Sequence, residues 1–194
     1  MARALFIAKM NDVTQLLGAL RRGDADASGT LLELVYSELH QLASARMSHE
    51  PAGHTLQPTA LVHEAWLRLG GAETANFQSR AHFFGAAAEA MRRILIERAR
   101  RKLAPRHGGG LQRVDIDEVE IATGAKDDDE LLALHAALDK FVTHSPRKAE
   151  LVKLRYFIGL TLDEAAEILD ISLATAKRDW TYARAWLFRE IRSA

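Results

Sequence analysis

The chain has 194 residues and no cysteine, which excludes disulfide bonds and thiolate metal sites. A cysteine-free chain is typical of the reducing cytoplasm, and we expect that location. No apolar run approaches the roughly 20 residues needed to cross a bilayer. The apolar part of the first nine residues is also too short for a signal peptide. Basic and acidic side chains number 26 each, so the net charge alone does not indicate a nucleic-acid partner.

The charges are nevertheless separated along the chain. Eight Arg or Lys residues and two Glu lie between Arg80 and Arg106, whereas eight acidic residues and one Lys lie between Asp115 and Glu130. This separation predicts a basic surface on one segment, followed by an acidic linker. It is a stronger indication of function than the neutral total.

Nearly all periodic segments have helical spacing, and none has a strand pattern of useful length. The sequence therefore predicts an all-α fold of two small helical domains joined by an acidic linker. The expected parts are an unstructured extension over residues 1–10, a first domain over 11–105, a linker over 106–127 and a second domain over 128–194. Within the first domain, helices are expected over about 12–22, 31–49, 58–69 and 79–103. In the second, Ser145 followed by Pro146 predicts a helix start.

The segment from Thr161 to Leu187 reads as a helix-turn-helix. Thr161 and Glu164 have the spacing of a capping box, and Ser172 can cap a second helix. Asp170 lies where the chain must bend, and Asp tolerates the left-handed conformation. The inward positions of the second helix are Ala176, Trp180, Ala183 and Leu187. The outward positions, suited to a DNA major groove, are Thr175, Lys177, Arg178, Asp179, Thr181 and Tyr182. An ordinary helical hairpin is the alternative for this segment taken alone.

A second candidate DNA-binding segment runs from Phe77 to Lys102. It combines aromatic residues at the start of a helix with six basic residues among its last eleven positions. Basic groups hold phosphates and exposed aromatic rings stack on unpaired bases, a combination used to bind single-stranded DNA. The alternative is that Phe83 and Phe84 belong to the core and that the arginines only solvate a long helix.

Taken together, the chain from about Asp12 resembles a bacterial RNA polymerase sigma factor of the extracytoplasmic-function (ECF) type, within the sigma-70 family. The segments 31–39 and 58–69 resemble the first helices of its region 2. Phe77 to Lys102 resembles the part that opens and reads the promoter −10 element, and Ser145 to Leu187 resembles region 4, which reads the −35 element. His63-Glu64-Ala65-Trp66 departs from the commoner Gln-Glu-aromatic pattern, which suggests an atypical branch.

The resemblance implies a role for each segment and implies neither a cofactor, a metal nor a catalytic residue. The expected partners are core RNA polymerase, through its clamp and flap regions, and promoter DNA, and an anti-sigma factor is a further candidate. The residues implied for polymerase docking are His63, Glu64 and Arg68. Those implied for the −10 element are Phe77, Arg80, Phe83, Arg92, Arg93 and Arg100. Those implied for the −35 element are Thr175, Lys177, Arg178 and Tyr182.

Two other classes of function remain as alternatives. A conventional helix-turn-helix regulator would bind a two-fold symmetric duplex site without polymerase. A metal-dependent hydrolase is suggested by four histidines within 24 residues, namely His40, His49, His54 and His63. The zinc-protease spacing His-Glu-x-x-His fails after His63-Glu64, and Gly108–Gly110 lacks the Lys-Ser/Thr of a phosphate loop. An enzyme is therefore disfavoured.

Overall fold

The computed structural model describes residues 2–24, 26, 27, 29–31, 33, 34, 36, 40, 58–69, 77–103 and 128–193. Among these residues the regular elements are all helices, so the predicted all-α class is confirmed. The helices are α1 (Ala2–Arg21), α3 (Pro58–Arg68), α4 (Arg80–Leu103), α5 (Asp128–His144), α6 (Pro146–Lys153), η2 (Leu154–Ile158), α7 (Leu162–Leu169) and α8 (Leu173–Arg192). Most of the helix expected over 31–49, and the linker over 106–127, lie outside the described residues.

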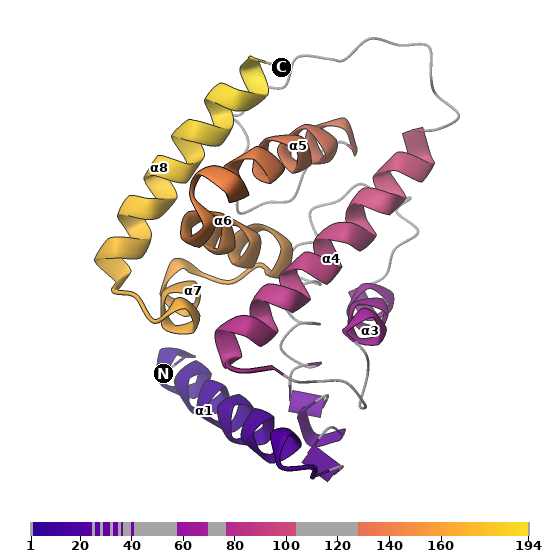
Figure 1. The fold of residues 1–194 in the computed structure, drawn as a ribbon, viewed down its shortest axis with the longest axis vertical. Coiled ribbons are helices and arrows are strands. Elements are labelled where there is room, and N and C mark those ends of the chain that lie inside the picture. The colour runs from indigo at the N-terminus through magenta and orange to yellow at the C-terminus, as the bar shows by residue number, and fades with distance from the viewer. Residues whose placement is uncertain are drawn as a thin grey trace.

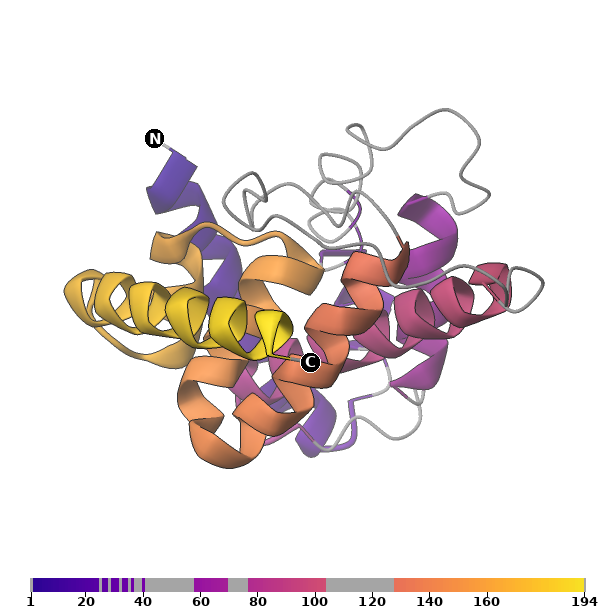
Figure 2. The ribbon, with the colours of Figure 1, turned by 90° about the horizontal axis from the view of Figure 1, so that it is seen from above.

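Helix α4 lies in the middle of the molecule (Figure 1). It packs against α3 on one flank and against α5, α6, η2 and α7 on the other. Figure 2, turned by 90°, shows α5 between α4 and α8. Helix α1 contacts both α4 and α7, so the first helix of the chain reaches the helix-turn-helix.

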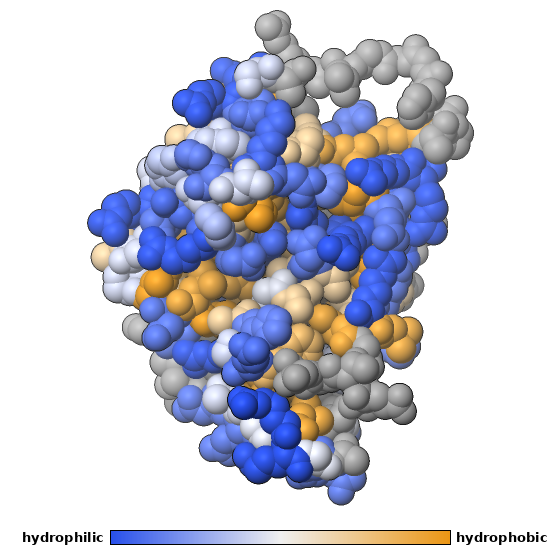
Figure 3. All heavy atoms as spheres, viewed as in Figure 1, coloured by the Kyte–Doolittle hydropathy of each residue, from blue (hydrophilic) through white to orange (hydrophobic). Residues whose placement is uncertain are grey.

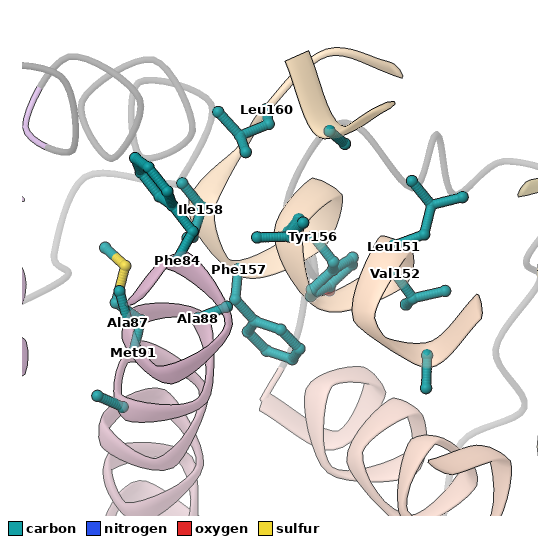
Figure 4. Close-up of a cluster of buried hydrophobic side chains, with 14 of the residues drawn as sticks. Phe84, Ala87, Ala88, Met91, Leu151, Val152, Tyr156, Phe157, Ile158 and Leu160 are labelled. Atoms are coloured by element: carbon teal, nitrogen blue, oxygen red, sulfur yellow. The ribbon is translucent and has the colours of Figure 1, made fainter. Parts of the chain in front are cut away.

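The helices of the two predicted domains share one hydrophobic core. From α4, Phe84, Ala88 and Met91 are at most 2% exposed, and from η2, Phe157 and Ile158 are at most 1% exposed. Figure 4 shows these side chains in a single apolar cluster. The division at residues 105 and 128 stays a prediction, but the described helices on either side of it are packed together.

The expected extension over residues 1–10 is wrong, because α1 begins at Ala2 and continues to Arg21. The first ten residues contain neither Gly nor Pro, and eight of them are Ala, Met, Leu, Lys or Arg, which are strong helix formers. Asp12 therefore lies inside the helix and does not start it. The predicted end near residue 22 is confirmed, since α1 ends at Arg21 and Gly23 follows with a left-handed φ of 87°.

Both the start of α6 and its connection to α7 differ in detail from the prediction. Pro146 occupies the first turn of α6 as expected, but Ser145 makes no side-chain capping hydrogen bond. Helix α6 continues into the π-helical turn η2, which ends at Gly159 with φ 95°. The left-handed conformation at this position favours glycine, and Gly159 turns the chain towards the start of α7.

Candidate nucleic-acid interface

The helix-turn-helix has the local geometry that the sequence predicts. The Glu164 amide donates to Thr161 Oγ1 at 3.2 Å, and the Thr161 amide donates to Glu164 Oε2 at 2.7 Å. Asp170 adopts the left-handed conformation at the bend, with φ 54°. The Thr175 amide donates to Ser172 Oγ at 3.1 Å and caps α8. Both helix starts and the turn are therefore confirmed.

The inward face of α8 is also confirmed. Ala176, Ala183 and Leu187 are at most 1% exposed, and Trp180 is 9% exposed. The guanidinium carbon of Arg155 lies 4.9 Å from the Trp180 ring centroid, which joins η2 to α8. Burial lowers the pKa of Arg155. Because its Nη1 still donates to the Leu160 carbonyl at 2.8 Å, Arg155 ties η2 to the start of the helix-turn-helix.

Asp179 does not face outward as the sequence analysis expected. It is 3% exposed, and its Oδ2 accepts a hydrogen bond from Arg147 Nη2 on α6 at 2.6 Å. Helical spacing explains the error, because position 179 is three residues after Ala176 and four before Ala183, on the same side as both. The charge of Asp179 had suggested a solvent position, but an ion pair allows a carboxylate to be buried.

The remaining candidates on α8 line its outer side. Lys177 and Arg178 are exposed, and Thr175 is half-buried. Tyr182 is 43% exposed, and its hydroxyl lies 3.0 Å from His144 Nε2. Figure 3 shows hydrophilic side chains along α8. These residues form a polar strip that is exposed or half-exposed within the part of the chain that the structure describes.

Two basic residues beside this strip were missed by the sequence analysis. Lys148 Nζ lies 4.7 Å from the Tyr182 ring centroid, and Arg147 is the partner of Asp179. Both come from the first turn of α6, next to the segment Ser145-Pro146. Two adjacent cations at a helix start were the signal that could have identified them. The polar strip of α8, which is basic at Lys177 and Arg178, therefore extends onto α6. We call the combined surface the basic strip.

The basic candidates on α4 differ in their environments. Arg92 is 3% exposed, and its Nη2 approaches His135 Nδ1 at 2.6 Å and pairs with Asp139, both on α5. Arg93 and Arg100 are exposed to solvent, as expected for DNA-contacting residues. One of these three arginines is thus enclosed by the C-terminal helices.

The candidates at the start of α4 are also engaged within the chain. Phe77 is 9% exposed and Phe83 is fully buried, and their ring centroids are 5.1 Å apart in an edge-to-face arrangement. Arg80 Nη2 donates to the Glu167 carbonyl on α7 at 2.5 Å. The core interpretation, which the sequence analysis gave for Phe83 and Phe84, therefore describes both in this structure, and Phe77 is buried as well. None of these rings is available for stacking on a base in this arrangement.

A series of ion pairs connects α4 to α6. Glu89 on α4 pairs with Lys153 at 3.2 Å, and Lys153 pairs with Glu150 at 3.0 Å. Burial would raise the pKa of Glu89, but Lys153 and Arg92 outweigh it and hold that pKa below its ordinary value. Glu89 therefore stays ionised between two cations at neutral pH.

The docking candidates lie on α3 and are tied to α4. Arg68 bonds Glu64 at 2.9 Å and Glu97 at 2.6 Å, and its hydrogen bond with Glu97 lowers the pKa of that carboxyl. His63 is exposed. Leu67, which the sequence analysis missed, is 61% exposed. Its position off the buried stripe of Leu61, Val62 and Ala65 was the available signal.

A scan against protein families gives a match to the ECF sigma factor model over residues 10–193. The chain belongs to the ECF sigma factor family. Proteins of this family are non-catalytic factors of transcription initiation, whose partners are core RNA polymerase and promoter DNA. No curated protein sequence matches the chain.

Two features are absent from the described part of this sigma factor. No helix there is both long and apolar enough to cross a bilayer. No three His, Asp or Glu side chains among the described residues are arranged to hold a metal ion. His49 and His54, which suggested a hydrolase, lie outside the described residues.

Acidification is expected to destabilise the sigma factor through His135. Burial and the neighbouring Arg92 lower the pKa of His135, with Arg100 adding to this and Asp139 and Glu89 opposing it. As the pH falls below about 6.5, the unfolded chain therefore binds a proton at this residue before the folded chain does. This effect lowers the stability of the folded chain as the pH falls from about 6.5 to the folded pKa of His135. Above about pH 6.5 the effect is absent, because His135 is neutral in both states.

The measurement is urea unfolding at about pH 7.5 and about pH 5.5 for the wild type and His135→Gln. The variant should lose less stability between the two values, because its amide does not titrate. An equal loss in both proteins would contradict this role of His135.

Proposed function

We propose that this ECF sigma factor binds core RNA polymerase in the cytoplasm through α3, melts and holds the −10 element with α4, and reads the −35 element with α8. The observation that supports it most is the exposed basic strip of α8, held on a correctly capped helix-turn-helix in a chain of this family. Lys177, Arg178 and Tyr182 are the residues directed to the major groove, with Thr175 at its edge. Lys148 is placed to contact the adjacent phosphates.

Some of the residues proposed for the −35 element provide sequence specificity, and others provide affinity. An arginine that bonds one guanine through two N–H groups provides about 1–3 kcal/mol of discrimination against another base. Lysines that contact phosphates add affinity without sequence preference. Arg178 is the candidate for the first role, and Lys177 and Lys148 are candidates for the second.

For the −10 element, the exposed Arg93 and Arg100 are placed to contact DNA phosphates. Arg80 and Arg92 join them only if their partners on the C-terminal helices are released. Extraction of a base costs a few kcal/mol of unstacking, which contacts with the polymerase and the single strand must offset. Phe77 and Phe83 are proposed to support the pocket that receives this base.

The decisive experiment is run-off transcription with purified core polymerase on promoters selected from a random library. A promoter-specific transcript that requires this protein supports the proposal. Without polymerase, the free protein should bind duplex promoter with a dissociation constant above about 1 µM at physiological salt, in the range of non-specific binding. Tight binding to a two-fold symmetric duplex, with no polymerase-dependent transcript, would favour a conventional helix-turn-helix regulator.

Glu64→Arg is expected to weaken binding of core polymerase by roughly 5- to 30-fold, a change of about 1–2 kcal/mol. The substitution reverses a charge on the exposed side of α3 and repels Arg68 and Arg98, which lie 2.9 and 3.7 Å from Glu64. Partly exposed ion pairs contribute little to stability, so the helical content should not change. A pull-down with core polymerase and circular dichroism provide the two measurements.

Glu97→Arg is the matched control. It breaks the other ion pair of Arg68, at 2.6 Å, but it changes a residue of α4 and leaves the surface of α3 intact. Equal binding by wild type and Glu64→Arg would reject α3 as the docking helix. Equal weakening by both variants would instead assign the effect to the position of Arg68.

A further inference from the structure

Tyr182 lies at the edge of the exposed side of α8, where residues of α5 and α6 hold it. Its hydroxyl lies 3.0 Å from Nε2 of His144, the last residue of α5. Its ring stacks on Phe141 of α5 with the centroids 6.4 Å apart, and Lys148 Nζ of α6 lies over the ring, 4.7 Å from its centroid. Contacts with two other helices therefore fix the position of the hydroxyl before DNA is bound.

His144 is itself held in place, although it is exposed. Its ring stacks on that of Trp186, with the centroids 5.8 Å apart and an angle of 18° between the planes. The Trp186 ring in turn lies 4.8 Å from that of Phe141, which is fully buried. The imidazole that faces Tyr182 is thus oriented by packing onto the core, so its hydrogen bond with the hydroxyl is preorganised.

The chemistry of the two groups indicates which of them donates. A phenol hydroxyl can donate or accept, and one nitrogen of a neutral imidazole can only accept. The lone pair of that nitrogen is a stronger acceptor than a phenol oxygen, whose electrons are delocalised into the ring. The Lys148 ammonium draws electron density from the ring of Tyr182, which strengthens its O–H as a donor. These properties favour donation from the Tyr182 hydroxyl to His144 Nε2.

A hydroxyl that donates its proton to an imidazole can only accept a hydrogen bond from DNA. Phosphate oxygens are acceptors, so such a hydroxyl makes no hydrogen bond with the DNA backbone. In the major groove, adenine N6 and cytosine N4 are amines, whereas guanine and thymine present carbonyl oxygens there. Among the base edges that distinguish the four pairs, only the two amines can donate to this hydroxyl.

We propose that His144 makes Tyr182 a hydrogen-bond acceptor, so that Tyr182 selects an adenine or a cytosine on the contacted strand of the −35 element. Tyr182 determines the specificity, and His144 is a positioning residue that acts through it. This inference rests on the proposed function, in which α8 reads the −35 element.

The position of this base follows from that of Arg178, the candidate for reading a guanine. Arg178 lies four residues before Tyr182 on the same side of α8, which is roughly 6 Å along the helix axis. That separation corresponds to about two base pairs at about 3.4 Å per pair. The base selected by Tyr182 should therefore lie within about two pairs of the guanine whose preference is lost in Arg178→Ala.

The test is run-off transcription by core polymerase with wild-type or variant protein, on promoters randomised over the −35 element. The wild type should prefer adenine or cytosine at one position by about 3- to 10-fold over guanine or thymine, as expected for one neutral hydrogen bond. Exchange of adenine for guanine, or of cytosine for thymine, replaces the amine by a carbonyl. Tyr182→Phe should remove the preference at this position and leave those at the other positions.

His144→Lys should reverse the preference. A lysine ammonium can only donate, so the Tyr182 hydroxyl accepts from it and turns its own proton towards DNA. The base preferred at this position should change to guanine or thymine. The position is exposed at the C-terminal end of a helix, where a cation is favourable. Thr143→Lys, which adds the same charge at the neighbouring exposed position, is the matched control and should keep adenine or cytosine.

The double variant separates positioning from a structural role. His144→Lys combined with Tyr182→Phe should have the preferences of Tyr182→Phe alone, because His144 acts only through the hydroxyl. A structural defect would instead lower transcription from all promoters equally. Circular dichroism monitors folding, and Tyr182→Phe leaves the imidazole and its stacking partner in place, so it tests the inference even where His144→Lys unfolds the protein.

The results distinguish failure of this inference from failure of the proposed function. If the wild type selects a −35 element but Tyr182→Phe changes no position, or removes a preference for guanine or thymine, the acceptor role is rejected and the function stands. The role of His144 is rejected if a folded His144→Lys variant keeps the wild-type preference. If the wild type with core polymerase gives no promoter-specific transcript, the proposed function fails and this inference fails with it.

Discussion

Trp180→Ala is expected to destabilise this sigma factor by about 3–5 kcal/mol, the usual loss when a buried aromatic residue is truncated to alanine. The indole is 9% exposed, it lies between the buried Ala176 and Ala183, and the Arg155 guanidinium packs on its face. Removing the indole leaves a cavity between η2 and α8, and the guanidinium of Arg155 loses the ring on which it packs. Thermal and urea unfolding, followed by circular dichroism, measure the loss.

Arg178→Ala is the companion variant. Arg178 is exposed two residues before Trp180, and the roughly 200° between them places it on the opposite side of α8. Its melting temperature should stay close to that of the wild type, while transcription from promoters with the cognate −35 element falls. The reverse pattern, in which Arg178→Ala unfolds the protein and Trp180→Ala only lowers promoter use, would mean that α8 is turned the other way.

Phe157→Ala is expected to have an effect of similar size, also about 3–5 kcal/mol. Phe157 is 1% exposed and belongs to the cluster in which η2 meets Phe84 and Ala88 of α4 (Figure 4). Because this cluster joins the two predicted domains, its loss should weaken their packing as well as the C-terminal helices. The wild type should unfold in one cooperative transition, and the variant should unfold earlier and in two steps.

Phe188→Ala is the matched control for this change. Phe188 lies near the end of α8, half-buried, with the Arg192 guanidinium 4.3 Å from its ring centroid. Its truncation should cost clearly less and should leave a single transition. Two separate transitions in the wild type, with Phe157→Ala affecting only one of them, would show that the shared core does not couple the two halves.

Local sequence was sufficient for the helix-turn-helix because its determinants are close together in the chain. Thr161 and Glu164 satisfy each other's backbone amides three residues apart, and Asp170 and Ser172 form the bend and the next cap. The spacing of Ala176, Trp180 and Ala183 identified the buried face for the same reason. The family resemblance, drawn from these motifs and their order, agrees with the family match.

Charge patterns were less reliable guides, because the sequence does not say which opposite charges meet. Asp179 was placed outward although its spacing is that of a buried position, and only the fold brings Arg147 to it. Arg92 was assigned to DNA, yet the fold surrounds it with His135 and Asp139, more than 40 residues away in the chain. An ion pair between distant helices has no periodic signature in the sequence.

The sequence by itself therefore determined the all-α class, the caps of the helix-turn-helix, the apolar side of α8 and the family, since each follows from contacts within a few turns or from the order of motifs. The tertiary structure alone decided how the halves are arranged. The apolar faces of α4 and η2 are each typical of any packed helix, and nothing local states that they bury against each other. Whether the basic face of α4 meets DNA or the chain's own carboxylates is decided by that packing.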